Sequence, residues 1–263
     1  MRIAWAACVA ASICTPAVAQ NQIDRQVDWS VGVAPVHRTL TERGTGGARL
    51  LTERGTLARI DAKAQPRSWD RRLQLRAAVT TGRLDYAGRT QSGIPLNTTT
   101  RHQEAELGAS WRALEAPGWG NLWVGADWLR LRRAVTAAPG ASALTETSSL
   151  VMPTLSWTSP ALAVGGVELQ ADARLRATAA HRLRVHFGGV FDDTAIHGGR
   201  RNEASIGVSA LLAPDWQLGL SLSRALQKAS DPMTLSRSGT WVGTVQQPDL
   251  RIDDVSLRLS RSF

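Results

Sequence analysis

Cysteine is almost absent from this sequence. The chain of 263 residues contains two cysteines, Cys8 and Cys14, and both lie close to the amino terminus. Everything after them is free of thiols, which excludes a disulfide framework and a thiolate metal site. The rest of the chain must therefore be held together by strand pairing, packing and ion pairs.

Long hydrophobic runs are lacking as well. Beyond the amino terminus, no segment reaches the roughly 18 uncharged apolar residues that a membrane-spanning helix needs. Apolar residues at the three- and four-residue spacing of an amphipathic helix are also missing there. The sequence therefore predicts neither a transmembrane helix nor a helical bundle.

The amino terminus has the three parts of an export signal. Arg2 supplies a positive charge, residues 3–14 form an apolar stretch, and Ala17-Val-Ala19 is a small-residue cleavage site before Gln20. We expect a secretory signal peptide over residues 1–19 and one mature domain over residues 20–263. Loss of Arg2 lowers the formal net charge from +9 to +8.

Lysine is nearly as rare as cysteine. Lys63 and Lys228 are the only lysines among the 31 basic residues, and the other 29 are arginines. Guanidinium groups bind carboxylates and phosphates with two parallel hydrogen bonds, and lipopolysaccharide carries both groups. The arginine bias therefore makes lipid and lipopolysaccharide the expected partners. No nucleic-acid-binding motif is present. Any further external ligand is unspecified.

Alternation of apolar and polar residues fills most of the mature chain. In Val167-Glu-Leu-Gln-Ala-Asp-Ala-Arg-Leu-Arg-Ala-Thr-Ala179 every odd position is apolar and every even position is polar. This period of two is typical of a strand with unlike faces. A soluble β-sandwich would also alternate, but here many apolar positions are alanine and the opposite face carries rows of charge, which a barrel lumen tolerates.

The last strand ends in the same alternation and an aromatic residue. It resembles the terminal signal by which Gram-negative outer-membrane β-barrels are handed to their assembly machinery, although Arg261 stands where that signal usually has an apolar residue. The resemblance implies an antiparallel transmembrane β-barrel in the outer membrane. The residues that carry it are Val255, Leu257, Leu259 and Phe263.

Turn signals divide the chain into ten expected strands. They lie near residues 27–42, 48–64, 70–87, 100–114, 122–135, 148–157, 166–191, 201–212, 216–227 and 252–263. An even number puts both chain ends in the periplasm, as bacterial barrels require. The strand over 166–191 is unusually long; a turn near Ala180 with an extra strand at Trp241–Val245 would instead give twelve. By parity along one unbroken strand, His186 is expected to face inward and His181 outward.

Two further features follow from this strand plan. Tryptophans near the predicted periplasmic ends should form an interfacial girdle; they are Trp29, Trp69, Trp111, Trp123, Trp157 and Trp216. The repeat Leu40–Thr45 and Leu51–Thr56 is expected to form the facing arms of a hairpin that turns at Gly46-Gly47; the alternative is a local duplication without function.

The polar faces are expected to line a closed lumen. A ten-stranded barrel is barely wider than the eight-stranded size that side chains can fill, and the inward charges are of mixed sign. We therefore expect salt bridges to occlude it. The expected lumen-lining residues are Glu104, Glu106, Arg112, Glu168, Asp172, Arg174 and Arg176.

Long strands on a ten-stranded barrel resemble the omptin surface proteases in architecture alone. That resemblance implies an acidic pair and an Asp–His pair at the barrel mouth. The nearest pairs here are Asp193 with His197 and Asp85 with His102; an imidazole held by a carboxylate can act as a general base. The segment around Asp193 reads equally well as a polar loop, so the sequence assigns no catalytic residue, metal or cofactor.

The sequence favours a non-enzymatic surface barrel. We expect a structural or adhesive role through the extracellular loops, with a salt-bridged lumen. The alternatives are a narrow, porin-like outer-membrane pore and, third, an omptin-like surface hydrolase.

Overall fold

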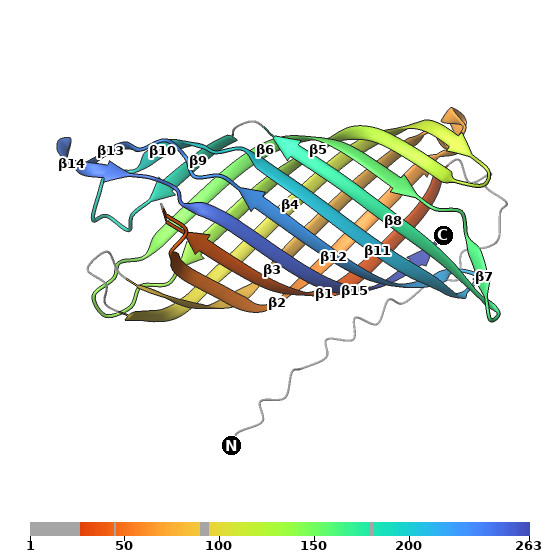
Figure 1. Cartoon of the computed structure of the whole chain (residues 1–263), viewed down its shortest axis with the longest axis horizontal. Coiled ribbons are helices and arrows are strands. Elements are labelled where there is room, and N and C mark those ends of the chain that lie inside the picture. Colours follow the sequence, from red (N-terminus) through yellow and green to blue (C-terminus); the bar gives the residue numbers. More distant parts are fainter. Residues whose placement is uncertain (1–26, 45, 90–94, 179–180) are drawn as a thin grey trace, which may run out of the picture.

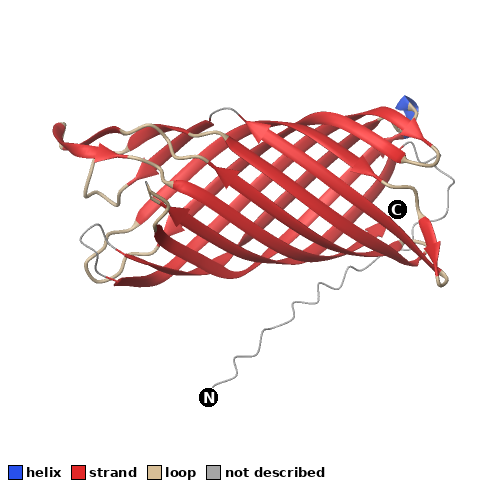
Figure 2. Cartoon of the chain, viewed as in Figure 1, coloured by secondary structure: helices blue, strands red, loops and turns tan. Residues whose placement is uncertain are grey.

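The chain forms a closed antiparallel barrel in the computed structural model, which describes residues 27–44, 46–89, 95–178 and 181–263 (Figure 1). The predicted signal peptide, residues 1–19, lies outside the described residues. Strands dominate this part of the chain, and its helical structure is confined to a 3₁₀ turn, η1 (Arg67–Trp69) (Figure 2). No helix in these ranges is long and apolar enough to cross a membrane.

Ten strands make the barrel wall in the described part of the chain, as predicted. They are β1 (Val27–Arg43), β2 (Arg49–Pro66), β3 (Leu73–Arg89), β4 (Pro95–Ala116), β5 (Gly120–Val135), β6 (Leu144–Thr158), β8 (Val167–Thr178), β11 (Arg201–Ala213), β12 (Trp216–Gln227) and β15 (Asp249–Ser262). Pairing of β1 with β15 and of β6 with β8 closes the ring. The hairpin of β1 and β2 turns at Gly46-Gly47, and the first three residues of each copy of the repeat, 40–42 and 51–53, face each other in it.

The remaining strands lie at the two ends of the barrel. β7 (Leu162–Val164) pairs with β8 beside the carboxyl terminus. At the opposite end, β9 (His181–His186) pairs with β10 (Thr194–Gly198), and β13 (Met233–Arg237) pairs with β14 (Thr240–Val245) (Figure 1). The twelve-strand alternative is wrong, because the segment Trp241–Val245 belongs to this separate two-stranded sheet.

The long strand expected over 166–191 is β8 followed by β9, with one extra residue between them. Thr154 and Ser149 of β6 are five residues apart, whereas their register partners, Arg176 and Arg182, are six apart. An offset of one residue in the register moves the following side chains to the other face of the sheet. The parity prediction for the two histidines is therefore wrong: His181 is buried, and the side chain of His186 is exposed.

A band of apolar side chains covers the outside of the barrel. Its larger exposed members are Val31, Val33, Ile60, Leu75, Val79, Leu107, Val124, Val151, Leu155, Leu175, Ile206, Val208, Leu220, Leu222, Val255, Leu257 and Leu259. Soluble monomers rarely expose contiguous apolar patches larger than a few hundred Å². An outward apolar band of this kind is typical of barrels whose outer face contacts the hydrocarbon of a membrane.

Toward the end that carries β9 and β14, apolar and polar residues exchange faces. On β3 the outward positions are apolar up to Val79, but beyond it Arg83 points outward while Leu84 is buried inside. On β5 the same exchange follows Trp128, because Leu129 is buried and Arg130 is exposed. Apolar clusters then fill the interior, as in a water-soluble barrel. Their buried members are Val36, Leu40, Leu51, Leu57, Leu84, Leu129, Leu150, Met152, Leu183, Val185, Ile196, Ala225 and Ile252.

Most of the predicted tryptophans lie toward the end that carries the carboxyl terminus. Trp69 packs on Trp111 with ring centroids 6.4 Å apart, and Trp157 packs on Trp119 at 5.9 Å. Trp29 and Trp216 are exposed. Trp123 is different and its prediction is wrong: it is only 4% exposed, because its even-numbered neighbours on β5 take the outward face.

The final strand turns its apolar residues outward. Val255, Leu257, Leu259 and Phe263 are all exposed on the outside of β15 or just after it. Arg261 shares this face, with its guanidinium 5.7 Å from the ring of Trp216 and 5.1 Å from that of Phe263. The aromatic rings accommodate a cation where the usual signal has an apolar residue.

Candidate functional site

Arg176 is the centre of the ion-pair network that crosses the lumen. Its guanidinium lies 3.1 Å from Glu106 and 3.3 Å from Asp127, and it also binds Glu203. Asp127, which is fully buried, pairs with Arg76 at 2.8 Å and accepts a hydrogen bond from Thr154. Breaking such a buried pair leaves an uncompensated charge and costs about 3–5 kcal/mol, so these side chains fix one another in place.

A second group of ion pairs lies beyond the first, toward β9. Arg38, on β1, pairs with Asp254 at 2.7 Å and also binds Glu104 of β4. The side chains of all three are largely buried. Strands distant in sequence are thereby joined across the interior, so this group also occupies the bore.

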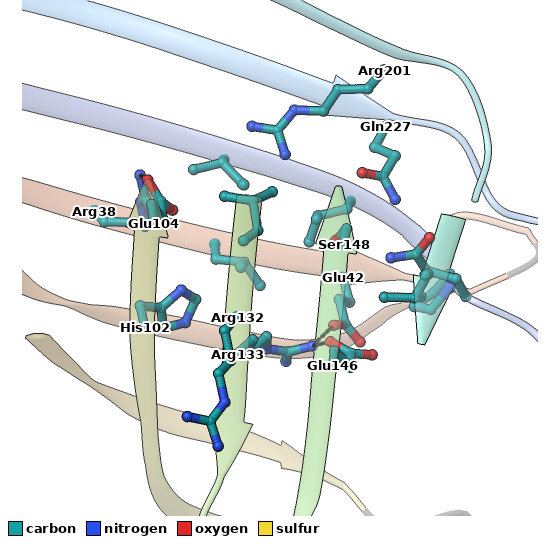
Figure 3. A pocket seen from close by; sticks show the side chains of 17 residues that line it. Arg38, Glu42, His102, Glu104, Arg132, Arg133, Glu146, Ser148, Arg201 and Gln227 are labelled. Carbon is teal, nitrogen blue, oxygen red and sulfur yellow. Dashed lines mark hydrogen bonds and ion pairs between the residues drawn. The ribbon is translucent and has the colours of Figure 1, made fainter. Parts of the chain in front are cut away.

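Arg133 holds three carboxylates together at the mouth of the barrel. Its guanidinium lies 2.6 Å from Glu42, 2.6 Å from Glu53 and 2.8 Å from Glu146. Figure 3 shows two of the three, Glu42 and Glu146. Glu53 also accepts a hydrogen bond from Thr100 and lies 2.6 Å from Nε2 of His102. This group is beyond the apolar band, since Arg133 follows Trp128, the last outward apolar residue of β5, by five positions.

The carboxylates of this group respond differently to burial. Burial and the neighbouring carboxylates Glu146 and Glu53 raise the pKa of Glu42 to about 7, although Arg133 opposes them. Burial would also raise the pKa of Glu53, but Arg133 and His102 outweigh it and hold that pKa at about 2. One guanidinium therefore neutralises Glu53 well and leaves Glu42 poised to bind a proton near neutral pH.

A small cavity adjoins this group. It encloses about 50 Å³, which is room for a few water molecules. Arg201 and Gln227 line it (Figure 3), and within the described residues Nε of Arg201 and Nε2 of Gln227 have no hydrogen-bond partner. These donors would be satisfied by ordered water.

Some of the predicted lumen residues lie in this network, and the others lie in the half of the barrel that carries the carboxyl terminus. Glu104, Glu106, Arg174 and Arg176 lie in the network, where Arg174 binds Glu106 at 3.2 Å. Arg112 lies near the carboxyl-terminal end and pairs with Glu115. Glu168 and Asp172 are exposed, and neither has an ion-pair partner in the part of the chain that the structure describes.

Neither predicted Asp–His pair forms. His102 is buried against Glu53, whereas Asp85 lies on the outward face of β3 opposite Arg54. Asp193 lies 2.5 Å from Nδ1 of His186, and His197 is instead the register partner of Arg182. The one-residue register offset between β8 and β9, which turns His186 outward, is the reason that the sequence missed this pair.

Sequence reasoning also missed a set of outward arginines just beyond the apolar band. We call them the arginine collar: Arg54, Arg83, Arg101, Arg130, Arg132, Arg182 and Arg184. All seven are exposed, and no carboxylate in the described residues forms an ion pair with any of them. By contrast, the network arginines within the lumen, such as Arg38, Arg133 and Arg176, are all paired.

The collar is densest on β5 and β9, the two strands that flank one end of β6. Ser149 of β6 is the register partner of both Arg130 and Arg182, and Thr147 is the partner of both Arg132 and Arg184. Each of these two hydroxyl residues therefore has one arginine on either side. The backbones of the two arginines are separated by two strand spacings, or about 10 Å. The switch of faces after Trp128 is the sequence signal that could have identified them.

The described residues contain no group of three or more His, Cys, Asp or Glu side chains that could hold a metal ion. No family model matches the sequence, and no curated protein does either.

Solved structures with a similar fold are outer-membrane barrels. The outer membrane protease OmpT from Escherichia coli matches with a TM-score of 0.56 and 11% identity over 92% of this chain and 98% of that one. The β domain of the Bordetella autotransporter BrkA matches with a TM-score of 0.47 and 15% identity over 90% and 99% of the two chains. At such identities the likeness to OmpT shows a shared fold, and the chain therefore has the fold of an outer-membrane β-barrel.

Proposed function

We propose that this chain resides in the bacterial outer membrane and binds the phosphate groups of lipopolysaccharide through its arginine collar, while ion pairs close its lumen. Both chain ends then lie in the periplasm, and β9, β10, β13 and β14 extend into the extracellular space. The barrel fold and the apolar band support the membrane location. Assembly is proposed to use the barrel-insertion machinery, through Val255, Leu257, Leu259 and Phe263.

One contrast carries the proposal: the network arginines inside the barrel are paired, and the collar arginines are not. An exposed guanidinium beside a hydrocarbon boundary is at the depth of lipid headgroups. Arginine binds phosphate with two parallel, charge-assisted hydrogen bonds. Arg130, Arg132, Arg182 and Arg184 face one another across β6, so they could bind one multiply phosphorylated headgroup together.

The test is binding of lipid A to the purified barrel in a neutral detergent. A variant with Arg130, Arg132, Arg182 and Arg184 all changed to Gln should bind at least tenfold more weakly, and the affinity of the wild type should fall with added salt. The matched control changes Arg67, Arg71, Arg72 and Arg261 to Gln, which removes the same charge at the periplasmic end. Equal losses in both variants, or equal binding of dephosphorylated lipid A, would refute the proposal.

The pore is the second candidate, and the exposed Asp172 and Glu168 in the periplasmic half of the lumen favour it. A surface hydrolase is the third candidate function, and the exposed pair of His186 and Asp193 favours it. Stable single-channel conductance of the wild type would favour the pore. Hydrolysis of a surface substrate that is lost in His186→Ala and kept in His197→Ala would favour the enzyme.

A further inference from the structure

The wall of the barrel is irregular where β6 meets β8 and β9. The register of β6 with β8 covers Thr154–Thr158, and that with β9 covers residues 145–149. Between these two registers β6 carries Pro153, which has no N–H to donate to a ladder. The register of β6 with β8 and its register with β9 also differ by one residue.

A groove of about 640 Å³ lies on the outer surface at this position. Its volume falls in the range of about 300–1,000 Å³ that small-molecule sites occupy. Small side chains line it, among them Ala177 and Ala204, together with larger apolar ones, among them Leu155 and Leu175. Arg224 lies at one end.

The strand register gives the direction of the groove. Five register partners on adjacent strands form one row across the groove. In order from β12 to β5 they are Arg224, Ala204, Leu175, Leu155 and Val124. This row crosses four strand spacings, or about 19 Å. That is close to the roughly 15 Å depth of hydrocarbon in one leaflet.

The two ends of the row lie at different depths. Arg224 comes directly beyond Leu222, where the apolar face of β12 meets its first outward charge. Val124 lies deep in the band, since Ala126 and Trp128 continue the apolar face of β5 above it. The groove thus descends from the polar boundary into the hydrocarbon region.

Arg224 also has charge available for an anion. It pairs with Asp253 at 2.6 Å, but Asp253 is shared with Arg251 at 2.6 Å, so two guanidinium groups face one carboxylate. The side chain of Arg224 is 56% exposed. Arg224, Arg251 and Asp253 together carry one excess positive charge, which a phosphate bound at this end would neutralise.

We propose that this groove binds one acyl chain of a lipid A molecule, with a phosphate of that lipid on Arg224 at the upper end. The proposal rests on the membrane location and collar binding above, and it adds a specific site for the hydrocarbon part of the ligand. A second groove of about 540 Å³, lined by Trp29, Ala77 and Val151 among others, has no outward arginine among its lining residues. It therefore serves as an internal control.

Native mass spectrometry of the folded barrel in neutral detergent with added lipid A tests the proposal. The wild type should retain one lipid A molecule, and Ala204→Phe, which fills the groove, should weaken retention roughly tenfold. Ala77→Phe, in the second groove, should retain lipid A as the wild type does. Ala177→Phe repeats the test if Ala204→Phe does not fold, and Arg224→Gln should also weaken retention, roughly tenfold.

Fully deacylated lipid A separates this proposal from collar binding. Its phosphorylated sugar should bind Ala204→Phe as well as it binds the wild type, and should bind the four-arginine variant less. Unchanged retention of lipid A by both groove-filling variants would overturn the acyl-chain site and leave collar binding intact. An equal loss in Ala77→Phe would overturn it too, since any bulky substitution on the lipid face would then have the same effect.

Discussion

Arg83 and Arg101 are register partners on β3 and β4, with both side chains exposed on the outer face just beyond the apolar band. Like charges directly opposite each other destabilise a sheet, by an amount of the order of 0.2–1 kcal/mol. No carboxylate of the described residues pairs with either arginine. The pair therefore weakens the isolated barrel, and a bound phosphate would relieve the repulsion.

The first prediction follows from this pair. Arg83→Gln should raise the free energy of unfolding in neutral detergent by about 0.2–1 kcal/mol and should lower the affinity for lipid A. Chemical denaturation and lipid A binding measure the two effects. Arg89→Gln, also on β3, is the control, because its register partner is the uncharged Pro95. A loss of stability in Arg83→Gln would contradict the interpretation.

The second prediction concerns pH. The pKa of Glu42 in the folded protein, about 7, is above its ordinary value, so the folded state binds more protons than the unfolded state between about pH 4.5 and 7. The free energy of unfolding should fall as the pH rises through this range and level off above it. Glu42→Gln should remove this slope.

Glu53 makes the free energy of unfolding change with pH in the opposite direction, and at lower pH. Its pKa is held at about 2, so the stability that it contributes should be lost as the pH falls from about 4.5 toward 2. The two effects together place a stability maximum near pH 4.5 for this group. Denaturation midpoints of wild type, Glu42→Gln and the exposed control Glu115→Gln across pH 2–8 measure this; a slope retained in Glu42→Gln would show that another group causes it.

The third prediction is that the lumen is closed to ions. The wild type should show no stable conductance in planar bilayers, because Arg176 and its three carboxylates cross the bore. Replacing Arg174 and Arg176 together with Ala should leave the barrel closed, because the Arg38 group and the apolar clusters beyond it still occupy the bore. The change should also cost about 3–5 kcal/mol of stability, so heat-modifiability on gels must first establish that the variant is folded.

Arg258→Ala is the control for that experiment. Within the described residues Arg258 pairs with Asp61 and forms no hydrogen bond or ion pair with the carboxylates of Arg176, so its loss should leave the barrel closed and cost less stability than the loss of Arg174 and Arg176. Steady current through the unmodified protein would contradict the closed lumen and would make an outer-membrane pore the favoured function.

The fourth prediction compares the two faces of β8. Ala171→Arg puts a cation on the outward face in the middle of the apolar band, which should cost about 2–4 kcal/mol. Asp172→Asn, one residue on, should be much milder because Asp172 is exposed within the lumen. Folding titrations in lipid vesicles measure both, and the reverse order would mean that inside and outside are exchanged.

The sequence by itself determined the barrel and most of its faces. Alternation with a period of two is a local property, so Val167–Thr178 could be oriented without knowledge of any partner strand. The same reasoning identified the ten strands and rejected helices. It also grouped Glu104, Glu106, Arg174 and Arg176 on the inward face.

Only the tertiary structure decided which charges meet and where the alternation breaks. Glu53 and His102 are 49 residues apart, and Arg176 and Glu203 are 27 apart, so each contact depends on how the sheet closes and on the stagger of its strands. One extra residue between β8 and β9 reversed the faces of both histidines. The collar became recognisable once the position at which apolar residues change faces was known on neighbouring strands such as β3 and β5, because the closed barrel brings these positions together.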